Sequence, residues 1–127
     1  MGKSKRYRLG DLQLQIMRVL WQRGSANVAA VQEALADRAL AYTTVATMLH
    51  KMEDRGLVKH KSEGRAFVYQ AAVPPEVVSR SMAGDLLENL FAGSLAEMMS
   101  HLLKTRDVSR EELARLEQLI AERKRQT

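Results

Sequence analysis

Residues 42–56 read Tyr-Thr-Thr-Val-Ala-Thr-Met-Leu-His-Lys-Met-Glu-Asp-Arg-Gly, and this stretch decides the fold. Its large apolar residues recur at helical spacing, which predicts a helix with one buried stripe. The opposite face carries threonines, then an ionisable and a cationic side chain, with little acid among them. Such a face suits the major groove of DNA, where hydroxyl, methyl and cationic groups contact base edges and phosphates. The stripe consists of Val45, Met48, Leu49 and Met52, and the polar face consists of Thr43, Thr44, Thr47, His50 and Lys51.

Two short β-runs follow this helix. Residues 57–62 read as a strand, Glu63-Gly64-Arg65 as a turn, and residues 66–70 as the return strand. Phe67 and Tyr69 are two residues apart, so they share one face of a half-buried antiparallel hairpin. The order predicts a recognition helix followed by a hairpin wing.

Two further helices are predicted before residue 42. The first runs from Asp11 to about Gln22 and is ended by Gly24. Asn27 can cap the second, short helix. Three helices followed by a two-stranded hairpin form a winged helix-turn-helix, so the expected fold class is mainly α with a small β-hairpin. The inward residues are Leu12, Ile16, Val19 and Leu20 in the first helix, and Val28, Val31 and Leu35 in the second.

A proline pair, Pro74-Pro75, marks the expected domain boundary. Consecutive prolines stop regular structure and stiffen the connection. We therefore predict a winged-helix DNA-binding domain at residues 1–72 and a helical dimerisation domain at residues 73–127. Helices are expected from about Glu76 to Phe91, after Gly93, and from Ser109, where Ser109 and Glu112 form a capping box.

The helical domain needs a partner for its apolar stripes, because three short helices of about fifty residues cannot bury a good core alone. These stripes could pack on the winged domain of the same chain, or on the same helices of a second copy. We expect the second arrangement, a two-fold homodimer that presents two recognition helices to a roughly palindromic operator. The expected interface residues are Leu86, Leu90, Leu95, Met98, Met99, Leu102, Leu113, Leu116 and Ile120.

The net charge of +5 is unevenly distributed. Residues 1–72 hold 12 Lys and Arg against 6 Asp and Glu, whereas residues 73–127 hold 8 against 9. Localised positive charge is expected of a phosphate-binding surface, although ordinary solvated charge would give the same count. The charge therefore supports double-stranded DNA as the partner without deciding the question.

Other chemistry finds little support in the sequence. The chain has no cysteine, which excludes disulfides, thiolate metal sites and cysteine nucleophiles. Its histidines, His50, His60 and His101, are far apart and on different predicted elements. Because no phosphate-binding glycine loop or nucleophile–base arrangement is visible, we expect no enzyme, no metal and no cofactor. No signal peptide or membrane-spanning run is visible, so we expect a cytoplasmic protein without membrane binding.

The chain resembles the penicillinase and methicillin-resistance repressors of bacteria (the BlaI/MecI type, with the CopY-type copper-responsive repressors as cousins). The strongest match is Leu-Ala-Tyr-Thr-Thr-Val-Ala-Thr-Met-Leu at residues 40–49, followed by Glu-Gly-Arg-Ala-Phe-Val-Tyr at residues 63–69. The match covers nearly the whole chain. Its other pieces lie at residues 9–12, 19–21, 31–35, 55–58, 91–95 and 107–113.

The resemblance implies a dimeric repressor that blocks a promoter until a signal removes it, with control of β-lactam resistance or a related stress response. Carried over position by position, the threonines of the recognition helix would reach base edges or nearby phosphates. Lys51 would anchor the DNA backbone, and Arg65 would reach an adjacent phosphate or the minor groove. Tyr42 could stack against a sugar-phosphate or close the core, and His50 can add a phosphate contact. The resulting DNA-binding set is Tyr42, Thr43, Thr44, Thr47, His50, Lys51 and Arg65.

Two departures from the family pattern concern the release signal. In the resistance repressors, a membrane sensor's signal leads to cleavage of an Asn-Phe bond in the first dimerisation helix. Asp85-Leu86 stands at that place here, so an upstream sensor or protease is left open. The copper-responsive cousins carry a cysteine-rich motif, and thiolate copper sensing is excluded in a chain without cysteine.

Two other function classes are compatible with a winged helix. One is a protein–protein assembly module, against which the threonine face and the basic bias argue. The other is a regulator that senses a small ligand between the helical domain and the wing. With two Phe, three Tyr and one Trp, the chain offers little material for an aromatic pocket.

Overall fold

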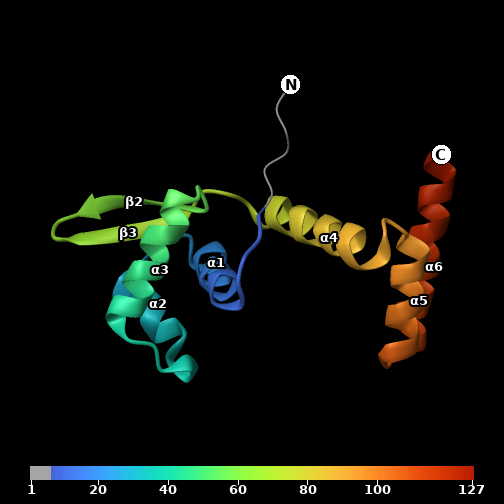
Figure 1. The fold of residues 1–127 in the computed structure, drawn as a ribbon, viewed down its shortest axis with the longest axis horizontal. Helices are drawn as coiled ribbons and strands as arrows, with labels where there is room; N and C mark the ends of the chain where they lie inside the picture. Colours follow the sequence, from blue (N-terminus) through green and yellow to red (C-terminus); the bar gives the residue numbers. More distant parts are fainter. Residues whose placement is uncertain (1–6) are drawn as a thin grey trace. The chain divides into compact units, whose positions relative to one another are not determined.

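The computed structural model describes residues 7–127 and divides the chain into two compact units, the first ending at Gly84 and the second spanning Asp85–Thr127. We refer to them as the winged unit and the helical unit. The predicted fold class, mainly α with a winged helix-turn-helix, is confirmed (Figure 1). The elements up to residue 71 are α1 (Asp11–Arg23), β1 (Ala26–Asn27), α2 (Val28–Ala34), η1 (Ala36–Arg38), α3 (Tyr42–Asp54), β2 (Val58–Glu63) and β3 (Ala66–Ala71).

The core of the winged unit is built from the apolar stripes that helical spacing predicts. These stripes face one another, because each amphipathic helix must cover its apolar face with a neighbour. Met48 and Leu12, at the margins of their stripes, are partly buried and pack against this core. Within residues 7–127, seven apolar residues are 0% exposed, namely Ile16 and Met17 of α1, Val31 of α2, Val45, Leu49 and Met52 of α3, and Leu57.

The sheet has a third strand that the sequence analysis missed. β1 pairs antiparallel with β3, which places β3 between β1 and β2. β1 has two residues, too few for any alternation of apolar and polar side chains. The wing itself follows the prediction, because β2 and β3 pair up to Glu63 and Ala66 around a two-residue turn. Gly64 has φ +62° in this turn, a conformation that glycine adopts without a side-chain clash.

The winged unit extends beyond the proline pair to Gly84. The Trp21 indole N–H donates to the carbonyl oxygen of Val73 at 2.9 Å, and Val78, 1% exposed, belongs to the same core. Val78 lies in α4 (Pro75–Phe91), whose first half therefore packs with the winged unit. The compact unit thus includes side chains beyond the prolines, which interrupt the backbone without ending the core, and the functional boundary after residue 72 stays a prediction.

The helical unit contains the end of α4, α5 (Leu95–Thr105) and α6 (Arg110–Gln126), at the predicted places. Ser94 and Ser109 cap α5 and α6, each accepting a hydrogen bond from the N–H three residues later. Neither α5 nor α6 has a buried residue. The two helices flank an apolar groove of about 560 Å³, lined by Leu95, Ala96, Met99, Leu116, Leu119, Ile120, Arg123, Lys124 and Thr127.

Candidate nucleic-acid interface

The exposed face of α3 carries the side chains that the sequence predicts for DNA contact. Val45, Leu49 and Met52 turn this helix's apolar stripe into the core, so the opposite side of the helix faces outward. Tyr42, at the first position of the helix, is 52% exposed and does not close the core. The other exposed members of the predicted set on α3 are Thr43, Thr44, Thr47, His50 and Lys51.

Arg65 reaches the same region from the wing. It lies in the exposed turn between β2 and β3, and β2 adds Lys59 and Lys61 to the exposed cations of the hairpin. A groove of about 330 Å³ brings Tyr42 and Arg65 together, although they are far apart in the sequence. Its lining residues are Asn27, Val28, Ala29, Tyr42, Ala46, Arg65, Ala66, Phe67 and Tyr69.

Phe67 lies in this groove and is absent from the predicted DNA-binding set. It shares a face of β3 with Tyr69, yet Phe67 is 51% exposed whereas Tyr69 is 5% exposed. Tyr69 belongs to the hydrophobic core of the winged unit and Phe67 does not, and β1 pairs with β3 at Tyr69 and Val68 only. The sequence shows the shared face, but it does not show how far the core extends along it.

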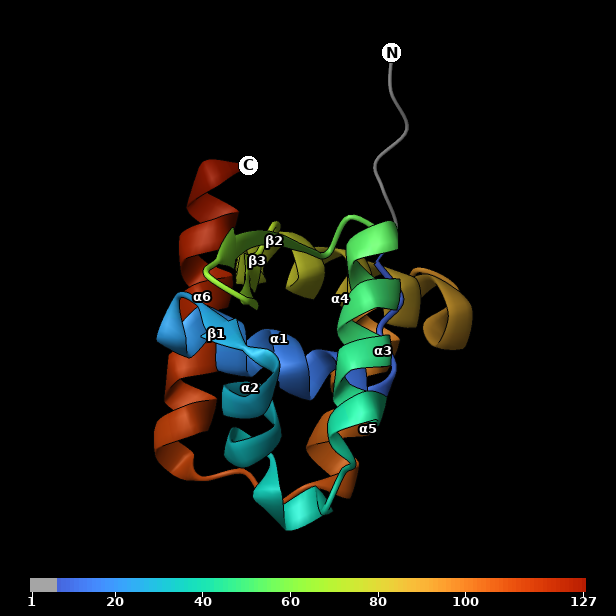
Figure 2. The same ribbon diagram turned by 90° about the vertical axis from the view of Figure 1, so that its left-hand side faces the viewer.

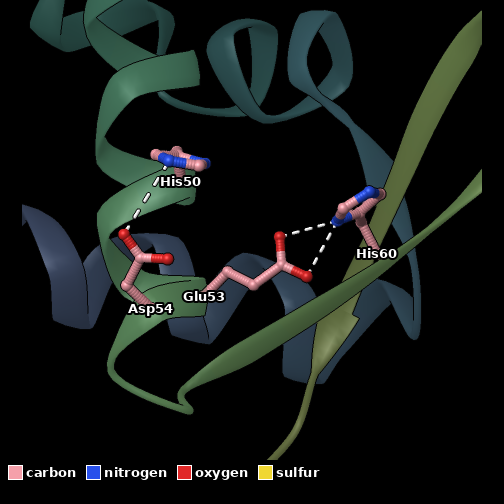
Figure 3. Close-up of polar contacts among 4 residues, drawn as sticks. All are labelled: His50, Glu53, Asp54 and His60. Carbon is pink, nitrogen blue, oxygen red and sulfur yellow. Dashed lines mark hydrogen bonds and ion pairs between the residues drawn. The ribbon is translucent and has the colours of Figure 1, made fainter.

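The wing is joined to α3 by a polar contact (Figure 3). His60 Nδ1 of β2 lies 2.6 Å and 2.8 Å from the two carboxylate oxygens of Glu53, near the end of α3. Burial raises the pKa of the nearby Tyr69 phenol above its ordinary value, and the charge of Glu53 adds to the effect. The sequence assigns His60 no partner, because the contact exists only when the hairpin folds back onto the helix.

Other basic residues are engaged inside the winged unit. Arg55, which follows α3, donates to the carbonyl oxygen of Arg8 at 2.7 Å and to Gln13 Oε1 at 3.1 Å. Arg38 forms an ion pair with Asp11 at 3.0 Å. The basic surplus of residues 1–72 therefore serves the fold as well as the surface, and charge counting alone overstates what is available to DNA.

Metal binding and membrane insertion find no support in the described residues. Within residues 7–127 there is no cluster of three or more His, Cys, Asp or Glu side chains that could hold a metal ion. No helix in that range is long and apolar enough to cross a membrane. The dipeptide Asp85-Leu86, aligned with the cleavage site of the resistance repressors, lies within α4, where Leu86 is 44% exposed.

Comparison with known proteins decides the family. Residues 9–122 match the family model of the penicillinase repressor, which covers both units of the chain. The chain belongs to the penicillinase repressor family. This membership confirms the resemblance found in the sequence, and it assigns the chain to a family of transcriptional repressors that are not enzymes.

Two relatives illustrate the penicillinase repressor match. The chain is 28% identical over 117 residues to the penicillinase repressor of Bacillus licheniformis, with 91% of each chain covered. It is 35% identical over 122 residues to the transcriptional regulator BlaI of Mycobacterium tuberculosis, covering 90% of this chain and 88% of the relative. Both alignments include the helical unit as well as the wing.

A solved structure supports the fold of the winged unit. The DNA binding domain of the repressor BlaI superposes with a TM-score of 0.51 at 29% sequence identity. The superposition covers 59% of this chain and 93% of that domain. This penicillinase repressor relative therefore has the same winged-helix arrangement that the structure shows here.

Proposed function

We propose that this protein represses transcription as a homodimer that binds a roughly palindromic operator in double-stranded DNA. The observation that carries the proposal is the surface of α3, which exposes threonines and a lysine while its apolar stripe closes the core. Threonine is a poor helix former, so a cluster of threonines on this face has no stability rationale. DNA contact at this surface would explain the cluster.

The proposed contacts divide into base reading and backbone anchoring. Thr43, Thr44 and Thr47 offer hydroxyls to bases or phosphates and methyl groups to thymine. Lys51 anchors a phosphate, and His50 adds a second phosphate contact. Arg65 reaches a phosphate or the minor groove from the wing, and Tyr42 stacks against a sugar-phosphate from the groove that both residues line.

The proposed homodimer would cover the apolar surface of the helical unit. Leu90, Leu95 and Ile120 are 68%, 62% and 56% exposed, which is unusual for large apolar side chains of a stable isolated unit. A second copy can cover this surface with its own copy of the same apolar patch, as in a two-fold homodimer. The interface assigned from the sequence is retained, and it comprises Leu86, Leu90, Leu95, Met98, Met99, Leu102, Leu113, Leu116 and Ile120.

The genes that the protein would regulate are proposed from the names of its relatives. One relative is a penicillinase repressor, so a gene for β-lactam resistance, or one for a related stress response, is the proposed target. Repression at an operator places the protein in the cytoplasm. Release by a sensor or protease would act on α4, where Asp85-Leu86 replaces the Asn-Phe dipeptide of the resistance repressors.

The test is selection of a duplex from a random-sequence pool by the full chain, followed by fluorescence anisotropy with that duplex and with a scrambled version. We expect a dissociation constant of roughly 10⁻⁸–10⁻¹¹ M at physiological salt, at least ~10³ tighter than for the scrambled duplex. Failure to enrich any duplex, with weak and steeply salt-dependent binding to all DNA, would contradict the proposal.

A further inference from the structure

The contact between His60 and Glu53 joins the two elements that the proposed function assigns to DNA. His60 belongs to β2 of the wing, and Glu53 lies in the last turn of α3. The imidazole Nδ1 lies 2.6 Å and 2.8 Å from the two carboxylate oxygens, so its proton can be shared between both. The side chains are 31% and 28% exposed, which shields the contact from much of the solvent.

A second histidine–carboxylate pair on α3 provides an internal contrast (Figure 3). His50 Nε2 lies 3.7 Å from Asp54 Oδ2, with side chains 73% and 70% exposed. This pair stays within one helix, and exposed pairs at i,i+4 contribute little to stability. The His60 pair differs in all three respects, since it is shorter, more buried and formed between separate elements.

Aromatic side chains of β3 hold the His60 ring in place. The ring centroid lies 4.4 Å from that of Phe67 and 5.4 Å from that of Tyr69. The titratable groups facing His60 are thus Glu53 from α3 and Tyr69 from β3. Tilted aromatic contacts and a carboxylate together fix the orientation of the imidazole, and hence the place of β2 beside α3.

The groove beside this contact depends on how the hairpin meets the helix. Tyr42 and Ala46 of α3 form one part of its lining, and Arg65 and Phe67 of the wing form another. A shift of the hairpin would move Arg65 relative to α3, and a duplex could then not meet both elements at once. A tie between β2 and α3 therefore controls the geometry of the whole DNA surface.

We infer that His60 and Glu53 are positioning residues for DNA binding, which hold the wing where Arg65 and the exposed face of α3 contact the same duplex. This inference rests on the proposed function. Neither residue needs to touch DNA.

The experiment compares variants of the full chain on the selected and scrambled duplexes. We expect His60→Gln and Glu53→Gln to weaken specific binding by about tenfold, the size of one lost hydrogen bond. Asp54→Asn is the matched control for Glu53→Gln, because it removes one acid from the same turn without touching the wing. Asp54→Asn should retain the specific-to-scrambled ratio, and an equal loss in both variants would overturn the inference.

Coupling to Arg65 separates positioning from a general effect on stability. In an Arg65→Ala background the wing contact is already absent, so His60→Gln should cost less than about twofold there. Equal losses in both backgrounds would overturn the inference. Failure of the parent chain itself to bind a selected duplex would instead refute the proposed function.

Discussion

The winged unit and the helical unit differ in how they dispose of apolar side chains. In the winged unit, Ile16, Val45 and Leu49 are fully enclosed by neighbours of the same copy. In the helical unit, Leu95 and Ile120 remain more than half exposed, and α5 and α6 have no buried residue. The winged unit buries its apolar side chains within one copy of the chain. The helical unit leaves its apolar side chains exposed, where a second copy could cover them.

One copy of the chain can therefore support the proposed DNA-binding surface on a closed core. Its helical unit has no comparable core of its own. The residues proposed to read DNA stand on a core that needs no second copy. The residues proposed for dimerisation have no such support within the helical unit. Changes in the two units should therefore affect different measurements.

Leu49→Ala should cost about 2–5 kcal/mol in the free energy of unfolding of the winged unit. Leu49 is fully enclosed, and its removal leaves a cavity beneath the recognition helix. The fluorescence of Trp21, the one tryptophan of the chain, reports this unit during denaturation. An unchanged denaturation curve would show that the core does not depend on the stripe of α3.

Ile120→Asp should weaken the homodimer by at least about 2 kcal/mol, the cost of losing a central interface residue. Ile120 is 56% exposed and lines the groove between α5 and α6. Gln118→Asp is the control, since Gln118 is exposed on the same helix and does not line the groove. Sedimentation equilibrium should show dissociation for Ile120→Asp alone, and a dimer that survives it would refute the interface.

Thr44→Ala should cost about 1–3 kcal/mol on the selected duplex if this residue reads a base. Thr44 is exposed on the first turn of α3, so the core should be unaffected. Anisotropy titrations with the selected and scrambled duplexes measure the loss. Equal binding by variant and parent on the selected duplex would remove Thr44 from the base-reading set.

Lys51→Ala should weaken binding to all duplexes about equally and reduce the salt slope by about one unit. The loss of one phosphate contact releases one counterion fewer and carries no sequence information. Titrations at several salt concentrations give the slope. A loss confined to the selected duplex would instead make Lys51 a base-reading residue.

Removal of one helix cap in each unit should cost about 1 kcal/mol. Asn27 Oδ1 accepts the Ala30 N–H at 2.8 Å, and Ser109 Oγ accepts the Glu112 N–H at 3.1 Å. Asn27→Ala should lower the stability that Trp21 reports, and Ser109→Ala should raise the dimer dissociation constant. If Asn27→Ala changed only the dimer dissociation constant and Ser109→Ala changed only the stability of the winged unit, the division into two units would be wrong.

Much of this division could be predicted from the sequence, because it depends on local signals. The spacing of Val45, Leu49 and Met52 identified the buried side of α3, and Ser109 identified the start of α6. The exposed face of α3 followed as the complement of the buried stripe. Periodicity and capping act within a few residues, so a single sequence displays them.

The features that could not be predicted from the sequence depend on contacts between segments that are far apart along the chain. β1 exists because Ala26 and Asn27 meet β3, and the contact between His60 and Glu53 exists because the hairpin folds back onto α3. Val78 extends the winged unit beyond the proline pair for the same reason. No local sequence pattern predicts these long-range contacts, and they are visible only in the folded structure.

The most direct test of this account is the stoichiometry of the complex with the selected duplex. Sedimentation velocity of the full chain with that duplex, labelled with a fluorophore, gives the mass added at saturation. The account predicts two copies of the 14.3 kDa chain on each duplex, and two copies in free solution. A single copy at saturation on a duplex with both half-sites would contradict it.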